Sequence, residues 1–373
     1  MTKFRKKVLS VFNNKKVLIT GHTGFKGSWL TQWLLLHKAK VYGISDSIPT
    51  CPSLFEILKL SKSLEEDIRI DITDGKDLIS NIKRINPDFI FHLAAQPIVS
   101  LSYEDPVETI RTNVMGTVNL LEACRYLKNR CAVVIVTTDK CYENKEWVWG
   151  YKETDTLGGK DVYSGSKAAA EILFSSYFRS FLKHLPNIRI ASVRAGNVIG
   201  GGDWAKDRLV SDCMVAWSEN KKVKIRNPYS TRPWQHVLEP LSGYVNIANS
   251  LWHGGKINGE GFNFGPKSEN NINVLELITR LGDSWNFDDI NSHYTQYGDI
   301  SFAEGNLLKL NCDKALHWLG WQPVLSIEDS VYFTGQWYLN YYKTEENIIN
   351  YTKKQITSFE SRAQKKRISW AMD

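Results

Sequence analysis

Short apolar runs alternate with longer amphipathic stretches through the first half of the chain. Val17 to Thr20 has the pattern of a strand, Gly27 to His37 that of a helix, and Lys40 to Ile44 that of the next strand, which together make a βαβ unit. The same pattern predicts further strands at 68–70, 89–93, 133–136 and 189–193, and helices around 77–85, 109–126 and 163–181. Strands that alternate with helices predict an α/β fold with a parallel, doubly wound sheet.

The pattern changes after Val193, where loops rich in glycine, tryptophan and proline begin, such as 200–204 and 227–234. We therefore predict a nucleotide-binding domain over 1–195, to which residues 236–265 return, and a smaller mixed α/β substrate lobe over 196–342. Residues 343–373 are expected to form a helical or loose basic tail.

Composition excludes several classes of protein. With 42% hydrophobic and 23% charged residues, the chain is typical of folded soluble proteins and unlike disordered or collagen-like ones. The net charge of +7 is too mild to indicate a nucleic-acid partner, although it would help to attract a substrate that carries phosphates.

Cysteine usage and hydropathy indicate the compartment. The six cysteines include no Cys-x-x-Cys pair and have no histidine at ligand spacing, so we expect reduced thiols and no metal site. The apolar run Val8 to Phe12 is too short for a signal-peptide core, and no run reaches the length of a membrane span. A cytoplasmic protein without membrane insertion is expected.

Three glycines follow the first strand directly and open the first helix, in the run Gly21-His-Thr-Gly24-Phe-Lys-Gly27. Glycines let the chain turn tightly and let a diphosphate approach the backbone, while the helix N-terminus attracts the anion. The alternative is a simple turn. A carboxylate that binds the adenosine ribose is expected at the end of the second strand, where the chain has Ser45 and then Asp46.

A second group of polar residues follows the apolar run 132–136, in the triplet Thr138-Asp139-Lys140. Tyr163 and Lys167 come soon after and, four residues apart, share one helix face. A nearby ammonium group can lower the pKa of a phenol until it transfers protons near neutral pH. Redox chemistry combined with proton transfer is therefore predicted.

The glycine spacing and the position of Tyr163-x-x-x-Lys167 resemble the extended short-chain dehydrogenase/reductase superfamily, in its NAD-dependent epimerase/dehydratase family. The resemblance implies a bound NAD, with Tyr163 as the base for a sugar hydroxyl, Lys167 on the nicotinamide ribose and Thr138 on the same substrate oxygen. Besides Tyr163 and Lys167, it implies these cofactor-binding residues: Gly21, Thr23, Gly24, Phe25, Lys26, Gly27, Ser45, Asp46, Asp71, Ile72, Leu93, Ala94, Ala95 and Gln96. For the alanines, packing alone is the alternative.

Within this family, sugar 4-epimerases have small residues after the threonine, whereas nucleotide-sugar 4,6-dehydratases have an acid and a base there. Asp139 suits the acid that protonates the departing hydroxyl, and Lys140 stands where a glutamate base is usual. This departure, with the runs 20–30, 138–144, 147–151 and 232–236, resembles the dehydratase branch that acts on CDP-D-glucose. The resemblance implies a product that leads to dideoxy sugars of bacterial surface polysaccharide.

Several alternatives stay open. Lys140 could instead form a structural salt bridge with Asp139 or Glu143. The chain could be a 4-epimerase, a dehydratase of another nucleotide sugar, or a catalytically silent NAD sensor, although such sensors typically lose the tyrosine.

The resemblance also implies substrate contacts and an assembly. Asn197, Arg208 and Arg232 are the expected substrate-binding residues, because guanidinium groups match phosphate oxygens, with surface salt bridges as the alternative for the arginines. Ser100 stands where this branch is expected to have arginine. Helices 109–126 and 163–181 resemble the pair that forms a dimer interface in relatives, so we expect a homodimer or a tetramer.

Overall fold

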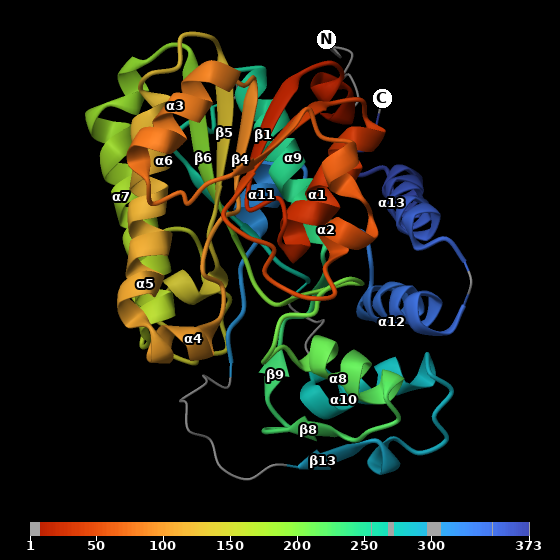
Figure 1. The fold of residues 1–373 in the computed structure, drawn as a ribbon. Coiled ribbons are helices and arrows are strands. Elements are labelled where there is room, and N and C mark those ends of the chain that lie inside the picture. Colours follow the sequence, from red (N-terminus) through yellow and green to blue (C-terminus); the bar gives the residue numbers. More distant parts are fainter. Residues whose placement is uncertain (1–7, 255, 268–271, 297–306, 345, 373) are drawn as a thin grey trace.

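Seven parallel strands form the central sheet of the protein, in the order β11-β6-β5-β4-β1-β2-β3 (Figure 1). The computed structural model describes residues 8–254, 256–267, 272–296, 307–344 and 346–372. The predicted doubly wound α/β sheet is confirmed. Its strands are β1 (Lys16–Thr20), β2 (Lys40–Ser45), β3 (Glu66–Arg69), β4 (Phe89–His92), β5 (Cys131–Val136), β6 (Ile188–Ala195) and β11 (Gly261–Phe264).

Helices cover both faces of this sheet, so alternate residues of one strand belong to different cores. In β1, Val17 and Ile19 pack with α1 (Phe25–Leu36) and α9 (Leu238–Trp252), while Leu18 packs with the opposite helix layer. That layer consists of α3 (Gly75–Ile85), α6 (Gly116–Cys124) and α7 (Val162–Ser180) (Figure 1). Burial on both faces explains why the strands are continuous apolar runs.

Smaller elements lie beside the carboxyl ends of the strands (Figure 1). The helices α8 (Leu209–Ser218) and α10 (Val274–Asp283) accompany two short ribbons, β8 (Val223–Ile225) with β13 (Tyr294–Gln296) and β9 (Thr231–Arg232) with β12 (Ile272–Asn273). A third ribbon pairs β7 (Val198–Ile199) with β10 (Gln235–His236). The remaining helices are α2 (Leu54–Ile57), α4 (Val99–Glu104), α5 (Pro106–Ile110), α11 (Asp313–Leu319), α12 (Ile327–Lys343) and α13 (Ile348–Lys365).

The structure differs from the sequence prediction in two places. The helix expected over 109–126 is interrupted by a π-helical turn at Arg111–Met115, between α5 and α6. The third strand lies at Glu66–Arg69, two residues before its predicted start.

The last segment takes the helical form, one of the two that were expected. It forms α13, whose buried Phe359 contacts Trp33 of α1 at a centroid distance of 5.8 Å. An apolar stripe of α13 therefore extends the core.

Candidate active site

The predicted chemical groups meet where β5 ends and α7 begins. The side chain of Asp161 caps α7 by accepting a hydrogen bond from the amide of Ser164 at 2.8 Å, which fixes the start of the helix. Tyr163 and Lys167 then lie on one helix face, against the 3₁₀ turn Asp139–Cys141 that follows β5. The structure thus brings together groups that are about 25 residues apart in the chain.

Hydrogen bonds join these groups into one buried cluster. The phenol of Tyr163 has a hydrogen bond with Thr138, whose hydroxyl donates to Oδ1 of Asp139 at 3.1 Å. Asp139 is 2% exposed, and its Oδ2 has no hydrogen-bond partner among the described residues. A buried carboxylate oxygen without a partner is costly, so the Oδ2 of Asp139 is suited to contact a polar group of a ligand.

Proton affinities in the cluster are shifted by burial. Burial raises the pKa of Tyr163 to about 12, against the opposing hydrogen bond with Thr138. Burial also lowers the pKa of Lys167 to about 8, while the carboxylate of Glu171 opposes the change. The expected lowering of the Tyr163 pKa by Lys167 is not found, because burial of the phenol raises this pKa and Lys167 is not among the groups that shift it.

Lys140 is partly buried, and its ammonium group has no ion pair or hydrogen bond within the described ranges. Glu143 is 3.9 Å from Lys145 instead. The structural salt bridge with Asp139 or Glu143, which was the alternative for Lys140, is not formed.

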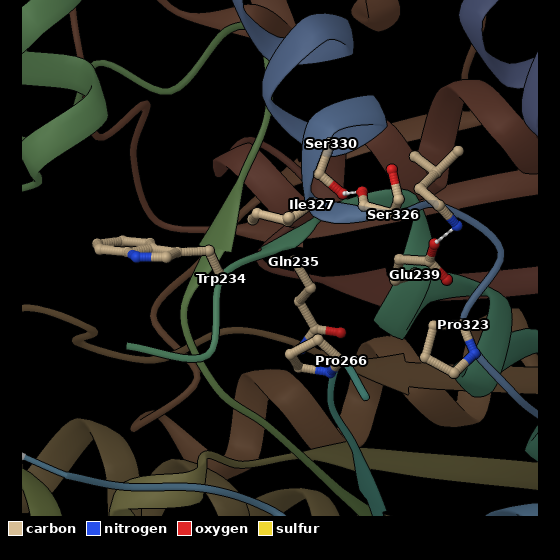
Figure 2. A pocket seen from close by; sticks show the side chains of 9 residues that line it. Trp234, Gln235, Glu239, Pro266, Pro323, Ser326, Ile327 and Ser330 are labelled. Carbon is tan, nitrogen blue, oxygen red and sulfur yellow. Dashed lines mark hydrogen bonds between the residues drawn. The ribbon is translucent and has the colours of Figure 1, made fainter. Parts of the chain in front are cut away.

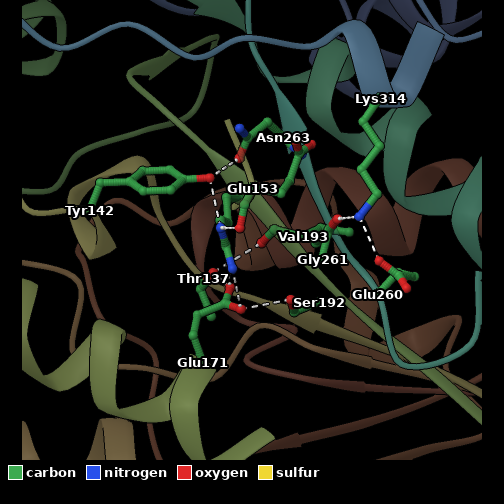
Figure 3. A network of polar contacts seen from close by, with 11 residues as sticks. Thr137, Tyr142, Glu153, Glu171, Ser192, Val193, Glu260, Gly261, Asn263 and Lys314 are labelled. Carbon is green, nitrogen blue, oxygen red and sulfur yellow. Dashed lines mark hydrogen bonds and ion pairs between the residues drawn. The ribbon is translucent and has the colours of Figure 1, made fainter. Parts of the chain in front are cut away.

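A buried polar network is centred on Glu171 of α7, on the same helix as Tyr163 and Lys167 (Figure 3). Glu171, four residues after Lys167, accepts hydrogen bonds from Thr137 at 2.5 Å, from Ser192 at 2.8 Å and from two nitrogens of Arg194 at 2.9 and 3.0 Å. Arg194 also donates to the phenol of Tyr142 at 2.7 Å. The network holds α7 on β5 and β6, so it fixes the position of the catalytic candidates.

Sequence reasoning missed this network and one further positioning residue. Asn113, in the π-helical turn, accepts from the amide of Gln96 at 2.9 Å and donates to Ser166 of α7 at 2.9 Å. It therefore ties the loop after β4 to the catalytic helix. The spacing of four between Lys167 and Glu171 could have revealed the network, whereas no local pattern announces the π-helical turn.

The three glycines of the first loop differ in what a side chain at each position would contact. Gly21 has φ +74°, and a Cβ there would lie 2.6 Å from the amide nitrogen of Ala94. A Cβ on Gly27 would lie 2.1 Å from the carbonyl oxygen of Gly21, so this glycine allows close packing of α1. A Cβ on Gly24 would make only one contact within 4 Å, with that same oxygen at 3.4 Å, which is an ordinary van der Waals distance. The packing of the protein therefore does not require glycine at position 24, and a ligand that approaches the backbone would account for it.

The start of α1 is built to accept an anion. The first bond of the helix runs from the amide of Ser28 to the carbonyl of Gly24, and no side chain caps the helix. The amides of Phe25, Lys26 and Gly27 precede that bond and are available to phosphate oxygens. Thr23 anchors the loop by donating to the carbonyl of Ser47 at 2.7 Å. This cradle fits the diphosphate of a dinucleotide.

The two ribose candidates at the end of β2, Ser45 and Asp46, differ in their exposure to solvent. Ser45 is buried and lies 3.0 Å from Nδ1 of His22, whose Nε2 lies 2.9 Å from a carboxylate oxygen of Asp67. Asp46 is exposed, and its carboxylate accepts from the amide of Ser47 at 2.7 Å. Asp46, rather than Ser45, therefore carries the carboxylate that a ribose could reach.

The other cofactor candidates follow the carboxyl ends of β3 and β4. Asp71 accepts from the amide of Thr73 at 2.8 Å, and Ile72 packs into the core against Gly116. The loop after β4 carries partly buried Leu93, Ala94 and Ala95 beside the first glycine. The amide group of Gln96 donates to Ile98 at 3.0 Å and to Thr109 at 2.9 Å, so this side chain shapes its own loop.

The substrate candidates lie around the loop after β6. Arg208 donates to Asp203 at 2.7 Å, and Arg232 is buried and donates to the carbonyl of Thr231 at 2.9 Å. Asn197 is partly buried beside β7. Ser100 donates to Asp207 at 2.7 Å, which links α4 to this loop.

A separate small pocket lies between α9 and the start of α12 (Figure 2). Its Glu239 accepts hydrogen bonds from the amides of Val324 and Leu325. Burial raises the pKa of Glu239 to about 7. None of the predicted site residues lines this pocket, and Glu239 serves there as a cap for the chain before α12.

None of the described helices has both the length and the apolar character of a membrane span. No group of three or more His, Cys, Asp or Glu in the described ranges could hold a metal ion.

The chain is similar to several known proteins. A family model described as GDP-mannose 4,6 dehydratase matches residues 18–333. The chain is 45% identical, over 94% of its own length and 97% of the relative's, to a Salmonella typhimurium protein named CDP-glucose 4,6-dehydratase. It is also similar to the solved UDP-glucuronic acid 4-epimerase of Bacillus cereus in complex with UDP-glucuronic acid and NAD, with 25% identity and a TM-score of 0.73 over 88% and 100% of the two chains. The dTDP-glucose 4,6-dehydratase of Bacillus anthracis, at 23% identity and a TM-score of 0.72 over 89% and 98%, shares the fold.

Proposed function

Because the chain belongs to the family described as GDP-mannose 4,6 dehydratase, we propose that it is a hydro-lyase that converts CDP-D-glucose to CDP-4-dehydro-6-deoxy-D-glucose and water. The observation that carries the proposal is the buried cluster of Thr138, Asp139 and Tyr163, with Lys140 beside it. The relative that is 45% identical supports CDP-glucose as the substrate.

NAD is the cofactor in this proposal, and the glycine loop fits it. The free amides at the start of α1, beside Gly24, would hold the diphosphate, Asp46 the adenosine ribose, and Lys167 the nicotinamide ribose. When bound, NAD supplies a hydride acceptor that is regenerated within each turnover.

Tyr163 acts first, by taking the proton of the hydroxyl on carbon 4. A phenol with a pKa of about 12 is protonated at neutral pH, so this step needs added positive charge. Lys167, with a pKa of about 8, supplies such charge at pH 7, and a bound NAD would add the positive charge of its nicotinamide ring. Thr138 holds the same oxygen through its hydroxyl.

Asp139 and Lys140 then remove water from the 4-keto sugar. Lys140 in its neutral form takes the carbon-5 proton, which the ketone has made acidic, and the electrons of that bond form the double bond between carbons 5 and 6. Asp139 gives its proton to the hydroxyl that leaves carbon 6 as water. Lys140 would then return its proton to carbon 5 when carbon 6 receives the hydride that was taken from carbon 4, which gives the 4-dehydro-6-deoxy sugar. The Oδ2 of Asp139, which lacks a hydrogen-bond partner among the described residues, supports its role, and the lack of a carboxylate paired with Lys140 in the same part of the chain supports that of Lys140.

The remaining parts of the proposal concern contacts and assembly. Asn197, Arg208 and Arg232 hold the nucleotide sugar, and the product serves dideoxy-sugar synthesis in the cytoplasm. An exposed apolar set on α5, the π-helical turn and α7 supports a homodimer: Val107, Ile110, Met115 and Ile172. Light scattering should give twice the chain mass, and Ile172→Glu should shift the protein to monomer; a wild-type monomer contradicts the assembly.

The enzymatic test uses the alkaline ultraviolet absorbance of 4-keto sugars after incubation with NAD and CDP-glucose, dTDP-glucose or GDP-mannose in turn. Signal with CDP-glucose alone is expected. Signal with another sugar alone would reassign the substrate, and an epimerised sugar without absorbance would reassign the reaction. Silence with all three would favour the NAD sensor.

A further inference from the structure

Lys26 stands apart from the other residues of the glycine loop. It is the second residue of α1 and is partly buried, and no hydrogen bond or ion pair of its ammonium group is found within the described ranges. An ammonium group held away from solvent without a direct partner is unfavourable unless a ligand meets it.

The start of α1 packs against the loop that leads to Arg208. Trp29, three residues after Lys26, donates to the carbonyl of Gly201 at 2.9 Å, and a Cβ on Gly200 would lie 3.1 Å from the ring of Phe25. Lys26 therefore lies where the cofactor loop meets the substrate loop. The charges that act on it electrostatically belong to the reaction and substrate side of the site: Arg208, Asp139, Lys167 and Asp203.

This group of charges has a positive excess. Asp203 is held by Arg208 at 2.7 Å, and Lys167 interacts with Glu171, which is itself bonded to Arg194. Lys26 thus remains the cation without a carboxylate of its own in direct contact. Burial lowers the pKa of Lys26 to about 8, and repulsion from Arg208 and Lys167 adds to the shift while Asp139 opposes it. A dianionic group would relieve this repulsion.

We propose that Lys26 is a substrate-binding residue whose ammonium group contacts the diphosphate of the nucleotide sugar, opposite Arg208. This inference rests on the proposed function and deepens it, because it assigns the side chain of Lys26 to the substrate while its backbone amide stays in the cofactor cradle. The arrangement makes a two-cation clamp, with one arm from α1 and one from the loop before α8, so the substrate joins the two parts of the protein.

The test compares the binding of two diphosphates by calorimetry. CDP is titrated into wild type and Lys26→Met, each with saturating NAD, and NAD is titrated separately. We expect CDP binding to weaken roughly 10- to 100-fold in the variant, which is the usual worth of a charge-assisted hydrogen bond. Lys26→Arg, which keeps the charge, should retain most of the affinity. Lys40→Met removes an exposed lysine at the start of β2 and should leave CDP binding unchanged.

An unchanged CDP affinity in Lys26→Met overturns the inference, whether or not NAD binding weakens; weaker NAD binding alone would return Lys26 to the cofactor. If the Met variant does not fold, Lys26→Gln provides the same comparison. If wild type binds another nucleoside diphosphate but not CDP, the proposed substrate fails, and the same variants titrated with that diphosphate still decide the role of Lys26.

Discussion

Replacing Glu171 with glutamine tests the buried network most sharply. The change keeps the size of the side chain but removes the charge that faces Arg194 at 2.9 Å, where the two side chains are 2% and 6% exposed. The new amide group would also point N–H donors at Ser192 or Arg194, which are donors themselves. Breaking a buried pair from one side leaves an unpaired buried charge, so we expect a loss of about 3–5 kcal/mol in the free energy of unfolding.

The matched control is Glu122→Gln. Glu122 pairs with Arg125 at 2.7 Å, but the two side chains are 26% and 39% exposed, so the expected loss is about 0–1 kcal/mol. Urea unfolding followed by tryptophan fluorescence and by circular dichroism measures both variants. Equal losses in the two variants would refute the view that the network stabilises the catalytic helix.

The same substitution affects Lys167. Glu171 is the group that holds the pKa of Lys167 up against burial, so its removal should lower that pKa further below about 8. Because the site needs the ammonium form, the alkaline fall in activity should move to lower pH in Glu171→Gln. A pH profile of kcat measures this shift, and an unmoved profile would separate Glu171 from the chemistry.

Three further predictions concern the base, the glycine loop and buried histidines. Lys140→Met should slow exchange of the carbon-5 proton with solvent by roughly 100-fold or more, measured by NMR; intact exchange removes Lys140 as the base. Gly24→Ala should weaken NAD binding at least tenfold yet keep its urea midpoint, whereas Gly27→Ala should lower the midpoint; normal NAD binding by Gly24→Ala refutes the cradle. Burial lowers the pKa of His92 and of His236 to about 3, so below pH 6.5 the unfolded chain binds more protons and stability falls as pH falls toward 3. The loss is roughly 2 kcal/mol per histidine at pH 5, and His236→Phe should flatten the decline; an equally steep decline would contradict the assignment.

Local patterns were enough to predict the sheet and the groups at its edge. The features used were short-range ones: continuous apolar strands, a glycine loop and the four-residue spacing of Tyr163 and Lys167. Each depends on neighbouring residues alone, so it can be recognised before the chain folds. The family resemblance likewise rested on short runs, and the comparisons confirm it.

The features that the sequence did not predict depend on contacts between distant segments. In the sequence, Glu171 cannot be told from any other charged helix residue. Its role depends on Arg194 of β6, which only the folded chain brings beside it. The raised pKa of Tyr163 comes from burial by several elements, which no spacing reveals. The packing of the apolar stripe of α13 could not be predicted, because its partners, such as Trp33, lie more than 300 residues away in the chain.

The central claim is that one site moves a hydride from carbon 4 to carbon 6 of CDP-glucose while water leaves. CDP-glucose that carries deuterium at carbon 4 tests this claim directly, with unlabelled NAD and NMR of the product. The account predicts 4-dehydro-6-deoxy sugar with deuterium on carbon 6. Deuterium that returns to carbon 4 of an epimerised sugar, or a product without deuterium on carbon 6, would contradict it.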